Sequence, residues 1–336
     1  AVLLSGDNCS TTIEPTQDIC PKGWRLPSNG GNPSYTNLFN IGGVSNATTA
    51  EVSPYLFTQS GNYNNGLSGH GGLYWSRTPS GVSNAYDIYY TNTFFLVSNN
   101  GSKQGGFSVR CVKMESMQEF TTAECNALTM ADSSNYATVK RELYDIRDNK
   151  HYTMAKMKDG NCWMTENLRL DGGITLTSEN TNLPSGTSVE LPANITEGTV
   201  SNATDLQIIR NKPGYDGNLY NWCAATLNNT DCATTTVEAT QDICPKGWTL
   251  PVNGTTTTDK SWAKLLSVYN ITTDAGLYTQ ESLGFNKYAG HYSHGGVTEF
   301  GQGSQFDYWS STPSSATNAY HLLAAGGSVY TSRNNV

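Results

Sequence analysis

The chain has 336 residues, a formal net charge of −8 and 14% charged residues, against about 25% in an average soluble domain. The acidic balance argues against a nucleic-acid binder, because such proteins need a basic surface to neutralise phosphates. The 7 Trp, 19 Tyr and 9 Phe argue against a disordered chain. No apolar run approaches the roughly 20 residues that span a bilayer, so we expect no membrane span in this stretch.

The first third of the chain predicts several strands and little helix. Residues 36–39 form one short helical segment. Residues 85–97 alternate with many Tyr and Phe, a pattern typical of a strand or a hairpin. Residues 106–112 predict a closing strand.

The rest of the chain adds a hairpin, an insertion and a helix. Residues 123–130 predict a helical turn or two, and residues 144–157 predict a hairpin around an Asp-Asn-Lys turn, followed by another extended segment. Residues 175–211 are rich in Thr, Ser, Asn and Pro and predict an irregular insertion. Residues 261–269 carry apolar side chains at helical spacing. The fold class is therefore α+β, mostly β with short helices and long loops, of a kind that disulfides stabilise.

A long internal repeat organises the chain. Residues 14–27 read EPTQDICPKGWRLP and residues 238–251 read EATQDICPKGWTLP, so twelve of fourteen positions agree at an offset of 224. Residues 74–80 (YWSRTPS) match residues 308–314 (YWSSTPS) at an offset of 234. These matches indicate a duplication with an insertion between the two blocks.

The repeat is out of phase with the numbering. Residues 1–113 correspond to the C-terminal half of a first repeat, residues 114–120 to a linker, and residues 121–336 to a second repeat that lacks the counterpart of the closing strand. Two explanations stay open: the sequence is a window of a longer repeat array, or neighbouring chains complete each other's domains.

The eight cysteines form no CxxC pair and no zinc-type spacing, and they favour a disulfide framework in an exported protein over buried thiols in the cytosol. A complete repeat would hold six cysteines, which allow fifteen connectivities. Our predicted pairs leave Cys9 and Cys244 without partners. These pairs are Cys125 with Cys162, Cys223 with Cys232, and Cys20 with Cys111.

Several motifs, in order, resemble the Fibrobacter succinogenes major paralogous domain (FISUMP) family. They are LYDIRDNKHY at 143–152, CWMTENL at 162–168, GNLYNW at 217–222, CPKGWTLP at 244–251, YWSS at 308–311 and FSVRCVK at 107–113. The resemblance covers nearly all of residues 118–336 and the C-terminal half of a second copy. It implies a C-type-lectin-like layout, tandem copies on exported bacterial surface proteins, and no established catalytic function.

We expect no enzyme activity and no cofactor. The segment at 23–27 also resembles a motif of formylglycine-generating enzymes, but that activity needs a pair of late cysteines and the chain offers only Cys111 there. His291 and His294 are three apart but lie in a Gly-rich loop, which favours solvated histidines over a metal site. Calcium near Asp145 and Asp148 is the one cofactor alternative, although Asp at such a turn commonly caps the backbone.

Two functions from different classes follow. The first is a non-catalytic repeat of an extracellular bacterial surface protein or filament, and the out-of-phase repeat favours it. Its partners would be copies of itself or adjacent repeats, and its purpose would be adhesion. The second is a discrete lectin-like module that binds glycans or host-surface proteins. Loops rich in Tyr, Asn and Gly differ between the repeats while their flanks match, which suits a scaffold with divergent contact surfaces. The candidate contact residues are Tyr63, Asn64, His70, Tyr288, His291 and Tyr292.

Overall fold

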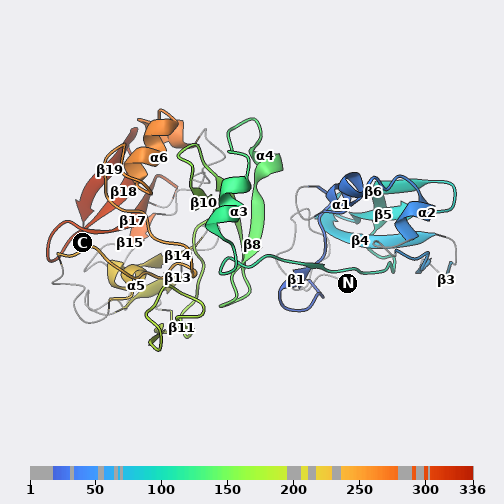
Figure 1. The fold of residues 1–336 in the computed structure, drawn as a ribbon, viewed down its shortest axis with the longest axis horizontal. Helices are drawn as coiled ribbons and strands as arrows, with labels where there is room; N and C mark the ends of the chain where they lie inside the picture. Colours follow the sequence, from blue (N-terminus) through green and yellow to red (C-terminus); the bar gives the residue numbers. More distant parts are fainter. Residues whose placement is uncertain are drawn as a thin grey trace. The chain divides into compact units, whose positions relative to one another are not determined.

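The computed structural model describes residues 18–30, 34–51, 57–63, 67–68, 71–194, 206–210, 217–228, 236–278, 290–292, 299–301 and 303–335. Within these residues the chain is mostly β with short helices, as predicted. It divides into two compact units, Ala1–Glu115 and Ser116–Val336, called unit 1 and unit 2 below (Figure 1). None of the helices found in the described ranges is long and apolar enough to cross a membrane.

A three-stranded antiparallel sheet dominates unit 1. β4 (Gly72–Pro79) pairs with β5 (Asn84–Tyr90), and β5 pairs with β6 (Phe95–Ser102), so β4 lies at an edge of this sheet. The segment predicted at 85–97 is therefore a hairpin, closed where the Thr91 N–H donates to the Phe94 carbonyl. Two smaller pairs complete the unit. They are β1 (Trp24–Arg25) with β7 (Val112–Lys113), and β2 (Asn62–Tyr63) with β3 (Leu67–Ser68).

The helices of unit 1 are α1 (Tyr35–Gly42) and α2 (Ala47–Glu51). α1 is longer than the helix predicted at 36–39 because both ends are capped. The Ser34 hydroxyl accepts the Asn37 N–H, and Gly43 takes a φ of 64°, a conformation that glycine adopts without Cβ strain. α1 and the sheet enclose an aromatic-rich core made of Tyr35, Phe39, Val44, Ala50, Phe57, Tyr74, Ile88 and Tyr90.

The segment predicted as a closing strand at 106–112 is strand only at its end, in β7. Before β7 it makes isolated bridges, from Gly106 to Tyr63 and from Ser108 to Tyr74. The regular strand prediction is wrong here because the segment passes along three different elements in turn, so no single partner gives it a continuous ladder.

Unit 2 begins with the predicted hairpin. β8 (Arg141–Tyr144) pairs with β9 (His151–Lys156), and β10 (Cys162–Met164) adds a third antiparallel strand on the other side of β9. The hairpin and the extended segment that follows it are thus confirmed. The turn depends on Asn149, whose φ of 61° lies in the left-handed region that Asn tolerates.

The predicted linker at 114–120 is not a separate exposed segment. Met114 is buried in unit 1, whereas Met117 and Phe120 are buried in unit 2, where Ser116 bridges to Tyr144. The physical reason is that this stretch carries apolar side chains, and removing them from water stabilises the fold more than leaving them exposed in a linker would. The predicted helical turn that follows is α3 (Thr122–Ala127), which starts with a capping box between Thr121 and Glu124.

The insertion predicted as irregular at 175–211 contains short strands, and the irregular assignment is corrected. β11 (Thr175–Thr177) pairs with β12 (Ser188–Glu190), and β13 (Ile208–Arg210) pairs with β14 (Asn218–Tyr220). These pairs form because apolar side chains within the polar stretch bury together. The resulting core contains Leu170, Leu176, Leu183, Leu191, Ile208, Ala224, Leu227 and Ile243.

Unit 2 ends with a sheet that repeats the sheet of unit 1. β17 (Gln305–Pro313), β18 (Ala319–Ala325) and β19 (Ser328–Asn335) pair in that order, with β17 at the edge (Figure 1). The register irregularity between Trp309 and Pro313 matches the one between Trp75 and Pro79. The duplication seen in the sequence therefore extends to the irregularities of the two sheets.

The remaining elements of unit 2 are short. The helix predicted at 261–269 is confirmed as α6 (Trp262–Val268), which begins where the Ser261 hydroxyl accepts the Lys264 N–H and packs against the final sheet. The others are α4 (Tyr136–Val139), α5 (Trp222–Thr226), α7 (Asp274–Tyr278) and the pair β15 (His291–Tyr292) with β16 (Glu299–Phe300).

Candidate functional site

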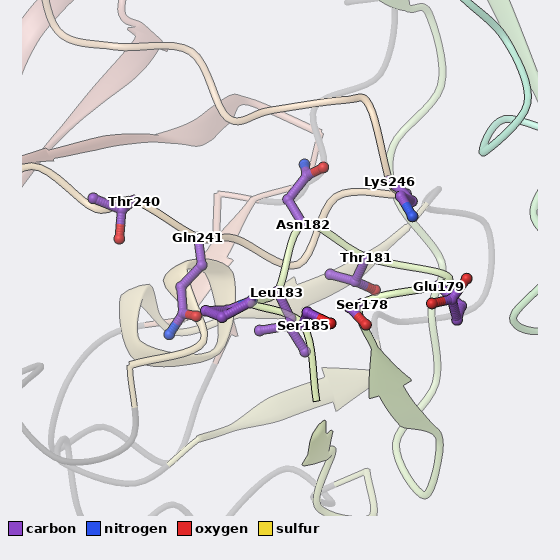
Figure 2. Close-up of a pocket in the computed structure, with 10 residues that line it drawn as sticks. Ser178, Glu179, Thr181, Asn182, Leu183, Ser185, Thr240, Gln241 and Lys246 are labelled. Carbon is purple, nitrogen blue, oxygen red and sulfur yellow. The ribbon is translucent and has the colours of Figure 1, made fainter. Parts of the chain in front are cut away.

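A polar pocket of about 610 Å³ lies in unit 2 between the insertion and the CPKGW loop at 244–248. Figure 2 shows Glu179 and Lys246 on one side of it and Thr240 and Gln241 on the other. The described residues that line it are Ser178, Glu179, Thr181, Asn182, Leu183, Pro184, Ser185, Thr240, Gln241 and Lys246. Hydroxyls and amides dominate this lining, so the pocket suits a ligand that exchanges hydrogen bonds.

The wall from the insertion is the loop that joins β11 to β12. The Asn180 amide oxygen accepts the Thr177 N–H at 2.9 Å, and Thr181 is fully buried at the bottom of the loop. Thr181 also makes an antiparallel bridge to Pro245, and the Lys246 N–H donates to the Asn180 carbonyl at 3.1 Å. The two walls are therefore hydrogen-bonded to each other below the pocket.

Asn182 joins the walls a second time. Its amide oxygen accepts the Gly247 N–H at 2.9 Å, and its amide nitrogen donates to the Trp248 carbonyl. Gly247 has a φ of 86°, a conformation that an L residue with a side chain rarely adopts. This turn and the Asn182 side chain hold the CPKGW loop against the insertion.

A buried ion pair lies behind the pocket. The Arg147 guanidinium binds both carboxylate oxygens of Asp145, with the shortest distance 2.6 Å, and both side chains are fully buried. Arg147 also donates to the Ile243 carbonyl at 2.6 Å, and Gln118 donates to Asp145 at 2.8 Å. With these contacts the pair ties the hairpin turn to the residue that precedes the CPKGW loop.

The pocket offers binding chemistry. Among its ten lining residues, Glu179 and Lys246 are the ionisable ones, and none is a histidine or cysteine. The arrangement can orient a polar ligand through hydrogen bonds and place one positive and one negative charge beside it.

Histidines that the sequence separates come together elsewhere in unit 2. His291 Nδ1 lies 3.2 Å from Asp307 Oδ2, and His321 Nε2 lies 3.1 Å from Asp307 Oδ1. Burial raises the pKa of Asp307, but hydrogen bonds and charge from His291 and His321 outweigh it and the net pKa is lowered. The sequence predicts a solvated His291, and this prediction is wrong because the ring is half-buried beside Asp307. β17 and β18 place Asp307 and His321 on neighbouring strands, which local sequence does not reveal.

The predicted contact residues that the structure describes do not line the pocket. Tyr63 is exposed on β2 of unit 1, paired with Leu67. His291 is half-buried beside Asp307, and Tyr292 pairs with Glu299 in unit 2. Asn64, His70 and Tyr288 lie outside the described residues. The pocket residues escaped prediction because their stretch reads as polar loop, although the Thr-Leu-Thr and Ser-Val-Glu alternation at 175–177 and 188–190 marks its strands.

Two predicted disulfides are present, Cys20–Cys111 in unit 1 and Cys125–Cys162 in unit 2. Cys223 is disulfide-bonded as well, while its predicted partner Cys232 lies outside the described residues, as does Cys9. Cys244 is a free thiol. Across the described ranges, no cluster of three or more His, Cys, Asp or Glu has a geometry that could hold a metal ion.

No family model, curated protein or solved structure matches this chain.

Proposed function

We propose that the chain is a non-catalytic extracellular repeat module of a bacterial surface protein or filament that serves adhesion. The observation that carries the proposal is the duplicated scaffold. Both units have the same three-stranded sheet with the same irregularity after Trp75 and Trp309. Tandem units that share the same sheets but differ in their loops are the arrangement expected of a surface repeat.

Three further features support an exported repeat. Disulfides staple both units, which suits an oxidising compartment. The order of motifs from 143–152 to 308–311 resembles the FISUMP family, whose members are tandem modules of exported proteins with a C-type-lectin-like layout. The low charge content and the many Asn, Thr and Tyr side chains suit hydrogen-bonded contact with a surface.

A second candidate, a lectin-like module, is favoured by one observation, the polar pocket of Figure 2. Hydroxyls and amides line it, and Lys246 and Glu179 add charges beside them. Glycans present dense hydroxyl donors and acceptors, so such a lining complements them. In this reading the pocket of unit 2 would be the contact point through which the repeat adheres.

The test compares localisation and adhesion. Antibodies against the chain should label the outside of intact bacteria that produce it, and beads coated with the chain should bind a glycan or host-cell surface. Lys246→Ala should weaken that binding, whereas Lys22→Ala, at the same repeat position in unit 1, should leave it unchanged. Labelling only after the cells are permeabilised would overturn the surface assignment.

Two further outcomes separate the two candidate functions. Binding that is lost with Lys246→Ala supports the lectin-like pocket. Binding that persists in both lysine variants supports adhesion by another surface of the repeat and argues against the pocket.

A further inference from the structure

The closing segment of unit 1, residues 105–113, is held by three elements in succession. The Gly106 N–H and carbonyl bond the carbonyl and N–H of Tyr63 at 2.8 and 2.9 Å. Ser108 then bonds the edge of β4, accepting from the Trp75 N–H at 3.0 Å and donating to the Leu73 carbonyl at 2.9 Å. Finally β7 pairs with β1. The segment therefore covers an edge strand that would otherwise be open to another chain.

Side chains fasten the same segment. The Phe107 ring stacks on Trp75 with a centroid distance of 4.1 Å, and the Arg110 guanidinium lies 4.2 Å from the centre of the Phe57 ring. Cys111 is bonded to Cys20. The recognition pattern is thus an aromatic ring, an arginine and a cysteine at positions 107, 110 and 111 of an extended segment.

Unit 2 holds Cys244, the counterpart of Cys20 in the repeat, with the same pair of hydrogen bonds. In unit 1 the Asp18 carboxylate accepts the N–H groups of Cys20 and Leu26, each at 2.8 Å. In unit 2 the Asp242 carboxylate accepts the N–H groups of Cys244 and Leu250, each at 2.9 Å. Cys244 thus occupies the position that Cys20 occupies in unit 1. β17, which corresponds to β4, is likewise the edge of its sheet.

The side chains that border the closing segment in unit 1 have less covered counterparts in unit 2. Trp75 and Leu26 are 5% and 0% exposed, whereas Trp309 and Leu250 are only half-buried. Residues 24–25 form β1, whereas residues 248–249 are in no strand. Cys20 is bonded, whereas Cys244 is a free thiol. The heptapeptide FSVRCVK occurs once in the sequence, at 107–113.

From this comparison we infer that unit 2 has a receiving site for an extended, cysteine-bearing segment of the 105–113 pattern, supplied from outside residues 116–336. Its cysteine bonds to Cys244, its aromatic ring covers Trp309, and its backbone pairs with the edge of β17 and with residues 248–249. This addition of a strand to an open edge is a known mode of recognition between chains. The inference deepens the proposed repeat function and rests on it, because it states how the repeated unit is closed.

The covalent step is a thiol–disulfide exchange. The Cys244 thiol loses its proton and its sulfur attacks the donor cysteine, which arrives as a mixed disulfide with a small thiol. The new sulfur–sulfur bond forms as the bond to the small thiol breaks. The departing thiolate carries away the electron pair and takes up a proton, so the mixed disulfide is the oxidant and the step balances.

The surroundings of Cys244 favour coupling with a docked segment over coupling with free small molecules. Burial raises the pKa of the Cys244 thiol well above its usual range, and the adjacent Asp242 carboxylate raises it further. Because the thiolate is the reactive form, Cys244 reacts slowly with dissolved disulfides. A segment held on the edge of β17 raises the local concentration of the donor disulfide and offsets this low reactivity.

The test uses the full chain and a synthetic peptide of residues 105–113 whose cysteine carries thionitrobenzoate. The peptide should form a one-to-one adduct, mapped by mass spectrometry to Cys244, about tenfold or more faster than a scrambled peptide of the same composition. A peptide with Phe107→Ala should couple more slowly. Cys244→Ser, which removes a free thiol and no existing bond, should abolish the adduct.

Hydrogen exchange provides a second readout. In the adduct, residues 248–250 and 307–309 should become protected, while residues 24–26 of unit 1 should stay unchanged. Equal coupling rates for the native and scrambled peptides would overturn the inference, because Cys244 would then be only an accessible thiol. A bond between Cys244 and another cysteine of the same chain, found by non-reducing peptide mapping, would overturn it too.

These outcomes are distinguishable from failure of the proposed function. Surface labelling and adhesion without peptide coupling would retain the repeat function and remove the receiving site. Peptide coupling by a chain that never reaches the cell surface would retain the receiving site and remove the adhesion role.

Discussion

Units 1 and 2 share a repeated sheet and cysteine loop, and the closing segment that covers them in unit 1 has no counterpart among the described residues of unit 2. Each has an antiparallel three-stranded sheet and an aspartate, Asp18 or Asp242, that accepts two N–H groups of the cysteine loop. In unit 1 the loop is bonded to Cys111, and in unit 2 the corresponding Cys244 is free. The comparison teaches that the loop conformation is set by the local carboxylate cap, because it persists without the disulfide.

The units also differ in what surrounds the cysteine loop. In unit 2 the insertion packs against this loop and forms the polar pocket with it, while Arg147 of the hairpin turn donates to the Ile243 carbonyl beside the loop. In unit 1 the described residues around the same loop include the closing segment instead. The repeated sheet and cysteine loop therefore border a pocket in unit 2 and a disulfide-bonded closing segment in unit 1.

The largest expected effect concerns the buried pair behind the pocket. Asp145→Ala leaves the Arg147 guanidinium buried without its partner, so unit 2 should lose about 3–5 kcal/mol of its free energy of unfolding. Unit 1 should keep its stability. Native-state hydrogen exchange, read peptide by peptide, reports each unit separately. Asp259→Ala is the matched control, since it breaks an exposed pair with Lys264 and should cost less than about 1 kcal/mol.

The next effect tests whether the closing segment decides burial. Leu26→Ala removes a fully buried side chain in unit 1 and should cost about 2–5 kcal/mol in the free energy of unfolding. Leu250→Ala, at the same repeat position, removes a half-buried side chain and should cost clearly less. Urea unfolding of both variants measures the difference. Equal losses would contradict the view that the closing segment buries Leu26 in unit 1 and leaves Leu250 less covered in unit 2.

A third measurement removes the disulfide of unit 1. Cys20→Ser opens the link to Cys111 across 91 residues and should destabilise unit 1 by about 2–4 kcal/mol. Cys244→Ser should leave the stability of unit 2 nearly unchanged, because no bond is lost. Hydrogen exchange of residues 18–26 and 242–250 follows both loops. Persistence of the Leu26 N–H protection in Cys20→Ser would strengthen the role assigned to Asp18.

The smallest effect is a pH response of opposite sign at two carboxylates, Asp171 in unit 2 and Asp87 in unit 1. Burial opposes ionisation of Asp171, but hydrogen bonds from Lys150, Asn194 and Asn218 outweigh it and lower its pKa to about 2. Stability from this carboxylate is complete above the unfolded pKa of 3.8 and is lost as pH falls toward 2. Urea unfolding of unit 2 between pH 5 and about pH 2 should show this loss, and Asp171→Asn should flatten it.

Asp87 supplies the matched case in unit 1. Burial raises its pKa, against the hydrogen bond from Asn99, so its ionised form disfavours the folded state. As pH falls through this raised pKa, that unfavourable contribution disappears and unit 1 gains stability relative to higher pH. Asp87→Asn should remove the gain. An unchanged pH response of unit 1 in Asp87→Asn would contradict this assignment.

Much of the fold could be predicted because its signals are local. The hairpin at 144–157 has its turn residues in place, and the helix at 261–269 has its apolar spacing and its serine cap. The duplication was readable because matching segments need no knowledge of the partner in space. The sequence by itself also determined the mostly β class, and the structure contains the predicted pairs Cys20–Cys111 and Cys125–Cys162, which the cysteine count alone could not select.

Only the tertiary structure decided the rest, because the relevant contacts join residues far apart in the chain. Asp145 and Asp148 look alike in the sequence. In the fold, however, Arg147 donates hydrogen bonds to Ile243 and Thr181 and forms a fully buried ion pair with Asp145. Asp307 meets His321 only because β17 and β18 pair in one register. The pocket depends on Asn180 and Asn182 bonding the CPKGW loop. Such long-range hydrogen bonds leave no periodic pattern in the sequence, so they appear only when the chain is folded.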